Sequence, residues 1–251
     1  MKKILLTIFA AFALFASTAF AGLGTYGYID IFYDNGATSE TGVYEFEYGM
    51  EFSEEGSPFS AVMELSFDGT NASFETATIT FAASDELSYT IGNILSYQGF
   101  EAYDQTGMYQ YSYQATGPVY SAAYAVGASV DYVTDDYSIG VWIGDTTTDE
   151  SYEYLFAYTG IEGLTAKYIY ADDPGYETDN FWVSYETGDL TLAYETTETD
   201  ESLIDMEMYL AYLAMGDAGL TVRYSEGTYL GADYEKTTFS PSYAFSDAVF
   251  G

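Results

Sequence analysis

The sequence contains neither cysteine nor histidine among its 251 residues. Without cysteine no disulfide can form, and no thiolate is available to bind a metal ion. Without histidine the Ser-His and Cys-His nucleophiles of hydrolases are excluded. A pair of carboxylates could still act as acid and base, but forty acidic residues bring carboxylates together by number alone, and no glycine-rich nucleotide motif occurs. The sequence therefore indicates a protein that is not an enzyme and has no cofactor.

Basic residues are scarce, with five Lys and Arg against forty Asp and Glu. Two of them, Lys2 and Lys3, lie in the leader described below. Without the leader 5 − 2 = 3 basic residues remain, Lys167, Arg223 and Lys236, and the net charge is 3 − 40 = −37. Nucleic acids and anionic head-groups require a basic surface, so neither is expected as a partner.

Long apolar runs are absent except at the start of the chain. Residues 1–3 supply a positive segment, residues 4–15 an apolar core and residues 19–21 an A-x-A cleavage site. This pattern predicts a secretory signal peptide at residues 1–21, outside the fold. The alternative, an N-terminal membrane anchor, is disfavoured because the run is short for a span. No later run reaches about eighteen apolar residues, so membrane insertion would require strands.

Aromatic residues are abundant, with 29 Tyr and 17 Phe. Residues 22–251 consist of short segments of alternating polarity between turn residues, which is typical of an outer-membrane barrel. We expect one all-β domain, a transmembrane antiparallel up-and-down β-barrel of about 14 strands, with 12 or 16 as alternatives. The expected strands are 24–34, 42–53, 58–67, 72–83, 86–94, 119–133, 136–145, 151–160, 163–171, 179–187, 189–197, 203–214, 217–226 and 234–246.

Apolar and polar side chains alternate along these strands, so apolar residues should face lipid and polar residues the lumen. In strand 203–214 this rule places Met206, Met208 and Leu210 on the lipid face, against Asp205 and Glu207 on the inner face. Glu75 is an exception, because it falls on the same face as the apolar residues Ala77, Ile79 and Phe81. The side chains expected to line the lumen are Asp30, Glu45, Glu47, Glu51, Glu64, Asp131, Glu153, Lys167, Glu186, Glu195, Glu207 and Arg223.

A soluble β-sandwich would show the same alternation. Two observations favour the barrel: the apolar faces are unusually aromatic, and the connections fall into two classes. Connections after every second strand are short, such as 84–85 and 134–135, whereas most others are longer and acidic, such as 145–150, 172–178 and 227–233. Short periplasmic turns with longer extracellular loops are the outer-membrane arrangement.

The longest interruption of the strands is residues 91–118, rich in aromatic side chains and glycine. Its run GFEAYDQTGMYQYSY, residues 99–113, resembles the OmpL-like family of outer-membrane porins, which is marked by G-[FY]-E-x-x-[DE]-x-T-G and an aromatic tract after a strand. The specific likeness spans about residues 91–144, and it implies a general diffusion porin of a Gram-negative outer membrane. The chain is shorter than the family pattern, carries Pro241 in its last strand and ends with Phe250 followed by Gly251.

The position of the long loop, at about residues 95–118, determines what it would do. Folded inward it would constrict the pore; folded outward it would be an adhesive or capping surface. The expected constriction residues are Phe100, Glu101, Tyr103, Asp104, Tyr109 and Tyr111. Acidic loops such as 145–150 could bind Ca²⁺ or Mg²⁺, but none has EF-hand spacing, and we expect no metal site.

The sequence as a whole predicts an exported outer-membrane porin for passive diffusion of small hydrophilic solutes. The acidic inner face should concentrate cations, although the acids could instead reflect a saline habitat. The alternative function is a non-conducting structural or adhesive barrel. Outer-membrane lipid is the expected surrounding, and the sequence leaves open the solute and whether the chains form homotrimers.

Overall fold

Alternating polarity and many aromatic residues favour extended strands, and the computed structural model is built from strands alone in its described part. It describes residues 5–11, 22–35, 39–67, 70–101, 109, 124–145, 149–200 and 204–244, of which 5–11, 30–35, 39–41, 43 and 44 are described by backbone only. In these ranges no helix has the length and apolar composition of a transmembrane span.

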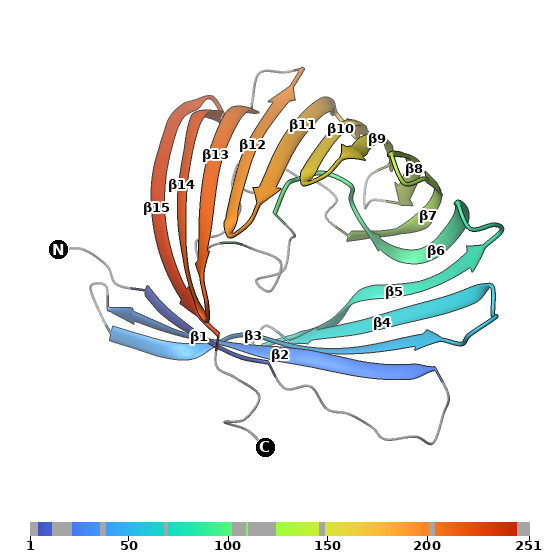
Figure 1. The fold of residues 1–251 in the computed structure, drawn as a ribbon, viewed down its shortest axis with the longest axis horizontal. Helices are drawn as coiled ribbons and strands as arrows, with labels where there is room; N and C mark the ends of the chain where they lie inside the picture. Colours follow the sequence, from blue (N-terminus) through green and yellow to red (C-terminus); the bar gives the residue numbers. More distant parts are fainter. Residues whose placement is uncertain are drawn as a thin grey trace. The chain divides into compact units, whose positions relative to one another are not determined.

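The strands form one antiparallel sheet in which each strand pairs with its neighbours in sequence (Figure 1). The strands are β1 (Leu5–Ala11), β2 (Leu23–Asn35), β3 (Ser39–Ser53), β4 (Phe59–Phe67), β5 (Ala72–Ala82), β6 (Leu87–Leu95), β7 (Tyr124–Val133), β8 (Tyr137–Asp145), β9 (Glu150–Ile161), β10 (Leu164–Asp173), β11 (Tyr176–Thr187), β12 (Leu190–Thr199), β13 (Ile204–Met215), β14 (Ala218–Tyr229) and β15 (Ala232–Tyr243). Strands β2 to β15 confirm the fourteen predicted from the sequence. The chain is therefore an all-β protein with up-and-down connectivity.

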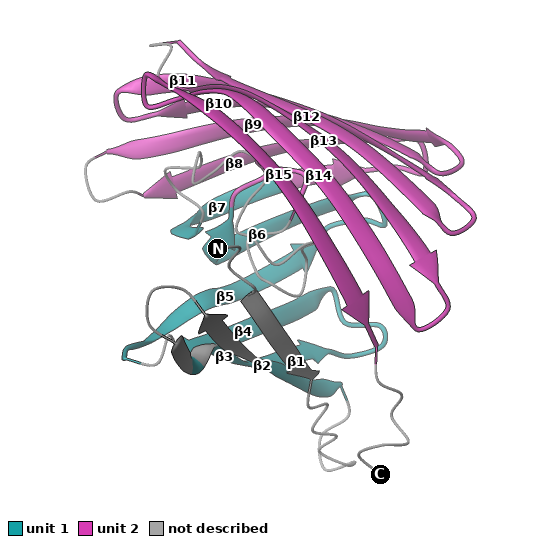
Figure 2. Ribbon diagram, turned by 90° about the vertical axis from the view of Figure 1, so that its left-hand side faces the viewer, with its two compact units in different colours: residues 1–95, 124–130 teal, residues 96–123, 131–251 magenta. Residues whose placement is uncertain are grey.

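The sheet divides into two compact units, coloured separately in Figure 2. Unit 1 comprises residues 1–95 and 124–130, and unit 2 comprises residues 96–123 and 131–251. Residues 5–11, within the expected leader, form β1, which pairs antiparallel with β2. That residues 1–21 are a signal peptide stays a prediction.

The connection after β6 is the long one, as expected, and two other connections differ from the prediction. Single short turns link β9 to β10 and β11 to β12, where Gly163 and Gly188 have positive φ of 77° and 58°. Two connections that the sequence predicts to be long are two-residue turns, one between β10 and β11 and the other at Leu230 and Gly231 between β14 and β15. At both places the strands extend further towards the turn than predicted: cross-strand pairing continues up to the turn, and Tyr229 pairs with Ala232 beside the second one.

The two faces of the unit 2 strands differ in what they expose. In β9 the side chains of Glu153 and Ala157 are buried, whereas those of Tyr154 and Phe156 are 49% and 50% exposed. We call the buried side the loop face, because the segment after β6 lies on it, and the other side the aromatic face. A continuous exposed aromatic surface of this kind suits contact with lipid.

The predicted orientation of β13 is wrong. Met206, Met208 and Leu210 are buried on the loop face, and Glu207 lies on the aromatic face, where it accepts hydrogen bonds from the hydroxyls of Tyr194 at 3.2 Å and Tyr209 at 2.6 Å. The reason is that alternation shows which residues share a face, not which face that is. In β13 the apolar side chains are buried because loop residues pack against them. On the aromatic face, the hydrogen bonds from the two tyrosine hydroxyls stabilise Glu207.

The glutamate with unexpected parity is explained by a β-bulge. The register of β4 and β5 shifts between Met63 and Leu65. On either side of the shift, exposed Phe74 and exposed Ile79 have opposite parity along β5. Glu75 therefore alternates correctly with Phe74, because a bulge inserts one residue and resets the alternation.

Candidate functional site

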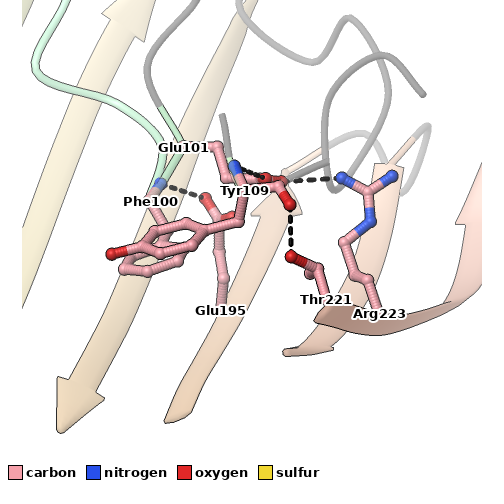
Figure 3. Close-up of polar contacts among 6 residues, drawn as sticks. All are labelled: Phe100, Glu101, Tyr109, Glu195, Thr221 and Arg223. Carbon is pink, nitrogen blue, oxygen red and sulfur yellow. Dashed lines mark hydrogen bonds and ion pairs between the residues drawn. The ribbon is translucent and has the colours of Figure 1, made fainter. Parts of the chain in front are cut away.

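The candidate site is the segment that follows β6, where residues 96–101 and Tyr109 lie on the loop face of unit 2. Of the expected constriction residues, the structure brings Phe100, Glu101 and Tyr109 to this face (Figure 3). The other three, Tyr103, Asp104 and Tyr111, lie outside the described residues.

The first anchor of the segment is Glu153 of β9, whose two carboxylate oxygens accept three hydrogen bonds. Oε1 accepts from the Ser96 hydroxyl at 2.6 Å and from the Gln98 amide at 3.0 Å, and Oε2 accepts from the Tyr97 backbone N–H at 2.7 Å. Hydrogen bonds to a charged group each contribute about 1.5–3 kcal/mol. The anchor exists because alternation places Glu153 on the loop face at the level of the segment's first residues.

The second anchor is a pair of side chains on the next strands, Asn180 of β11 and Glu195 of β12. Asn180 Oδ1 accepts from the Gly99 N–H at 3.0 Å, and Glu195 Oε1 accepts from the Phe100 N–H at 3.2 Å. The Asn180 amide also donates to Glu195 at 2.8 Å and to Thr197 at 2.8 Å. The two acceptors therefore hold each other in place as well as the loop backbone.

Aromatic packing fixes the middle of the segment. The Phe100 ring meets Trp182 of β11 edge to face at 5.3 Å, and it stacks on Tyr109 at 5.8 Å with an interplanar angle of 4°. Tyr109 in turn lies 5.2 Å from the ring of Tyr212 on β13. Beneath them are the buried side chains of Met208 and others of β12 and β13. These contacts make the apolar row of β13 part of one small core with the loop.

The end of the described segment is fixed by an ion pair, drawn in Figure 3. Glu101 Oε2 lies 2.7 Å from Arg223 Nη1, with side-chain exposures of 1% and 0%. Glu101 Oε1 accepts from the Tyr109 N–H at 3.1 Å, and the Thr221 hydroxyl donates to the Tyr109 carbonyl. Burial raises the pKa of Glu101 above its ordinary value, and Arg223 opposes that rise. Two residues of β14 thus bind the loop through different groups.

Other expected inner residues of unit 2 also lie on the loop face. Lys167 of β10 is half-buried, with Nζ 5.0 Å from the centre of the Trp182 ring. Asp131 of β7 accepts a hydrogen bond from the Tyr97 hydroxyl. Glu186 of β11 shares the parity of Trp182 and is exposed. Among the charged groups on this face, Glu186 is therefore one that water reaches freely.

In unit 1 four expected inner glutamates share one face of β3 and β4. Glu45 accepts from the hydroxyls of Tyr28 at 2.8 Å and Ser66 at 2.6 Å, and Glu64 accepts from the Tyr26 hydroxyl. Two more residues, Glu47 and Glu51, alternate with exposed aromatic side chains; the first is buried and the second exposed. The side chain of Asp30 lies outside the described residues.

Sequence reasoning missed the uncharged residues that bind the loop backbone. Asn180 and Thr221 carry no charge, and their position on the loop face is the one signal in the sequence that could have found them. Trp182 was missed for the same reason. In the described part of the chain no group of three or more metal-ligating side chains is arranged to hold a metal ion.

No protein-family model and no curated protein matches the sequence, but solved structures do. A mutant of Rhodopseudomonas blastica porin has a TM-score of 0.64 at 15% identity, over 96% of this chain and 91% of that one. A second mutant of the same porin gives 0.62 at 12% identity, and a triple mutant gives 0.61 at 13%, with the same coverage. At such low identity the likeness establishes the fold alone, and membership of the OmpL-like family stays a prediction. This chain has the fold of a porin, an antiparallel up-and-down β-barrel.

Proposed function

We propose that the protein is an outer-membrane porin, a channel and not an enzyme, through which small hydrophilic solutes diffuse passively with a preference for cations. The aromatic face would contact outer-membrane lipid, and the loop face would line the lumen. A barrel of about fourteen strands lies between filled eight-stranded barrels and wide sixteen-stranded porins, which leaves room for a narrow aqueous channel.

The observation that carries the proposal is the docking of residues 96–101 on the face opposite the exposed aromatic side chains. A loop that folds back onto the inner side of the wall narrows the pore and makes it selective. An adhesive loop would instead present its polar side chains to the exterior. Here Gln98 and Glu101 are buried against the strands, which favours the channel.

The preference for cations rests on the carboxylates that remain accessible. Glu51 in unit 1 and Glu186 in unit 2 are exposed on the proposed lumen side. Only three basic residues follow the leader. Acidic groups that line a low-dielectric channel raise the local concentration of cations.

Recording from planar bilayers that contain the purified protein tests the proposal. We expect stepwise conductance and, in a KCl gradient, a reversal potential of the sign that indicates cation selectivity. Conductance with anion preference would contradict the cation preference. A folded barrel, recognised by a gel mobility that changes on boiling, that shows no conductance would support the structural or adhesive alternative. The mobility of unboiled samples also reveals homotrimers.

A further inference from the structure

We infer that Glu153 and Glu195 are positioning residues of the pore: they set how far residues 96–100 reach from the wall, and thereby its width, and do not act as its selectivity charges. This inference rests on the proposed channel function. From alternation alone, Glu153 and Glu195 are expected to line the lumen surface; we assign them instead to holding the loop.

The pattern of contacts is the first argument. Five consecutive residues, 96–100, donate hydrogen bonds to acceptors on β9, β11 and β12. A segment that crosses successive strands cannot pair with the carbonyls of any one of them, because a ladder needs two chains running side by side. Buried N–H groups nevertheless require acceptors. Side-chain oxygens of Glu153, Asn180 and Glu195 supply them.

The second argument is that these carboxylates are not presented to water. The side chains of Glu153 and Glu195 are 0% exposed. Glu153 uses both of its oxygens for the segment, and Glu195 uses Oε1 for both the Phe100 N–H and the Asn180 amide. Glu186, on the same face, is exposed. A solute that passes the loop would meet Glu186 but not the two anchors.

The test compares Glu153→Gln with Glu162→Gln. The amide keeps the size of Glu153 but replaces one acceptor with a donor, so at least one of its three loop donors loses its partner. We expect E153Q channels to have a higher conductance and to admit larger neutral polymers, with an unchanged reversal potential in a KCl gradient. Glu162, exposed in the turn after β9, undergoes the same change of charge far from the anchors, and E162Q should match the wild type.

A second variant alters the loop and leaves the wall intact. Ser96→Ala combined with Gln98→Leu removes two donors to Glu153, and it should widen the pore as E153Q does; it also decides the matter if E153Q does not fold. A reversal potential shifted towards anions in E153Q at unchanged conductance and polymer cut-off would overturn the inference, as would wild-type width in the double variant. A wild-type barrel that does not conduct would contradict the channel function itself, whereas a conducting wild type with unaltered variants would contradict only the positioning role.

Discussion

Glu101 and Arg223 lie 122 residues apart in sequence, and they form a buried ion pair with 2.7 Å between Oε2 and Nη1. Burying two charges is costly, and the attraction between them repays that cost only when the geometry is good. The guanidinium cannot lose its proton in a protein, so Arg223 keeps its charge whether or not Glu101 is ionised. The pair therefore specifies where the end of the segment docks more than it adds stability.

Removal of Arg223 should release the loop. In Arg223→Gln the buried carboxylate loses its partner, and loss of one member of such a pair costs about 3–5 kcal/mol. We expect chymotrypsin to cleave folded R223Q within residues 102–118 much faster than the wild type. The double variant E101Q/R223Q, which leaves no buried charge, should be cleaved more slowly than R223Q. Glu162→Gln, which changes a charged residue exposed in the turn after β9, is the control, and equal cleavage of R223Q and wild type would contradict the role of the pair.

The pH dependence of docking follows from the raised pKa of Glu101, whose ordinary value is 4.5. Burial, the main cause, makes the docked state bind the proton more tightly than the undocked state does. Stability falls as pH rises wherever the native state binds more protons. The contribution of Glu101 should therefore be largest below its ordinary pKa and should decrease as pH rises through the raised one.

We accordingly expect acid to retain the loop. Between pH 7 and pH 4, cleavage by an acid-tolerant protease, corrected for its own pH profile, should slow more in the wild type than in Glu101→Gln, which cannot titrate. Loop release in acid by the wild type but not by E101Q would mean that the docked carboxylate has a depressed pKa, and it would contradict this expectation.

Packing of Phe100 should contribute separately from the charges. Phe100→Ala removes ring contacts with Trp182 and Tyr109, and loss of a half-buried aromatic side chain costs about 2 kcal/mol. We expect F100A to show faster loop cleavage and noisier single-channel current. Phe239→Ala is the matched control because its side chain is 69% exposed on the aromatic face. Equal effects of the two substitutions would indicate a general loss of barrel stability.

The sequence was sufficient to locate β2 to β15, because the residues of each strand alternate in polarity and the strand is bounded by turn residues. It also identified the loop, and alternation put Arg223 on the face opposite Val222 and Tyr224, as in the structure. It failed at β13, because apolar residues occur on both faces of this strand. Which face is buried depends on the loop residues that pack over Met208. In β13, where both rows contain apolar residues, contacts with the loop determine which row is buried.

The anchors of the loop could not have been found from sequence, for a different physical reason. The donors are largely backbone N–H groups, of Tyr97, Gly99 and Phe100, and every residue except proline has one. No pattern of side chains marks them. Alternation could predict which face Glu153 and Glu195 share, but not that the loop would use their oxygens.

The preference of the channel for cations or anions should depend on the accessible charges of the loop face. Glu186 and Lys167 carry opposite charges, so their removal should shift the reversal potential in opposite directions. Glu186 is exposed, and Lys167 is half-buried over Trp182. Glu186→Gln should move the reversal potential towards anions, whereas Lys167→Gln should move it towards cations, because each removes one charge from the solute path. Conductance at high salt should stay near that of the wild type in both, since neither residue holds the loop.

The dependence on salt separates a charge effect from a change of shape. The Debye length falls from about 10 Å at 0.1 M to about 3 Å at 1 M, so both shifts of reversal potential should be largest in dilute KCl and small in concentrated KCl. A shift that persists undiminished at 1 M would indicate altered pore geometry. Shifts of the same sign in the two variants would show that the loop face does not select by the charge of Glu186 and Lys167, and the acidic face of β3 and β4, with exposed Glu51, would then be the next place to substitute.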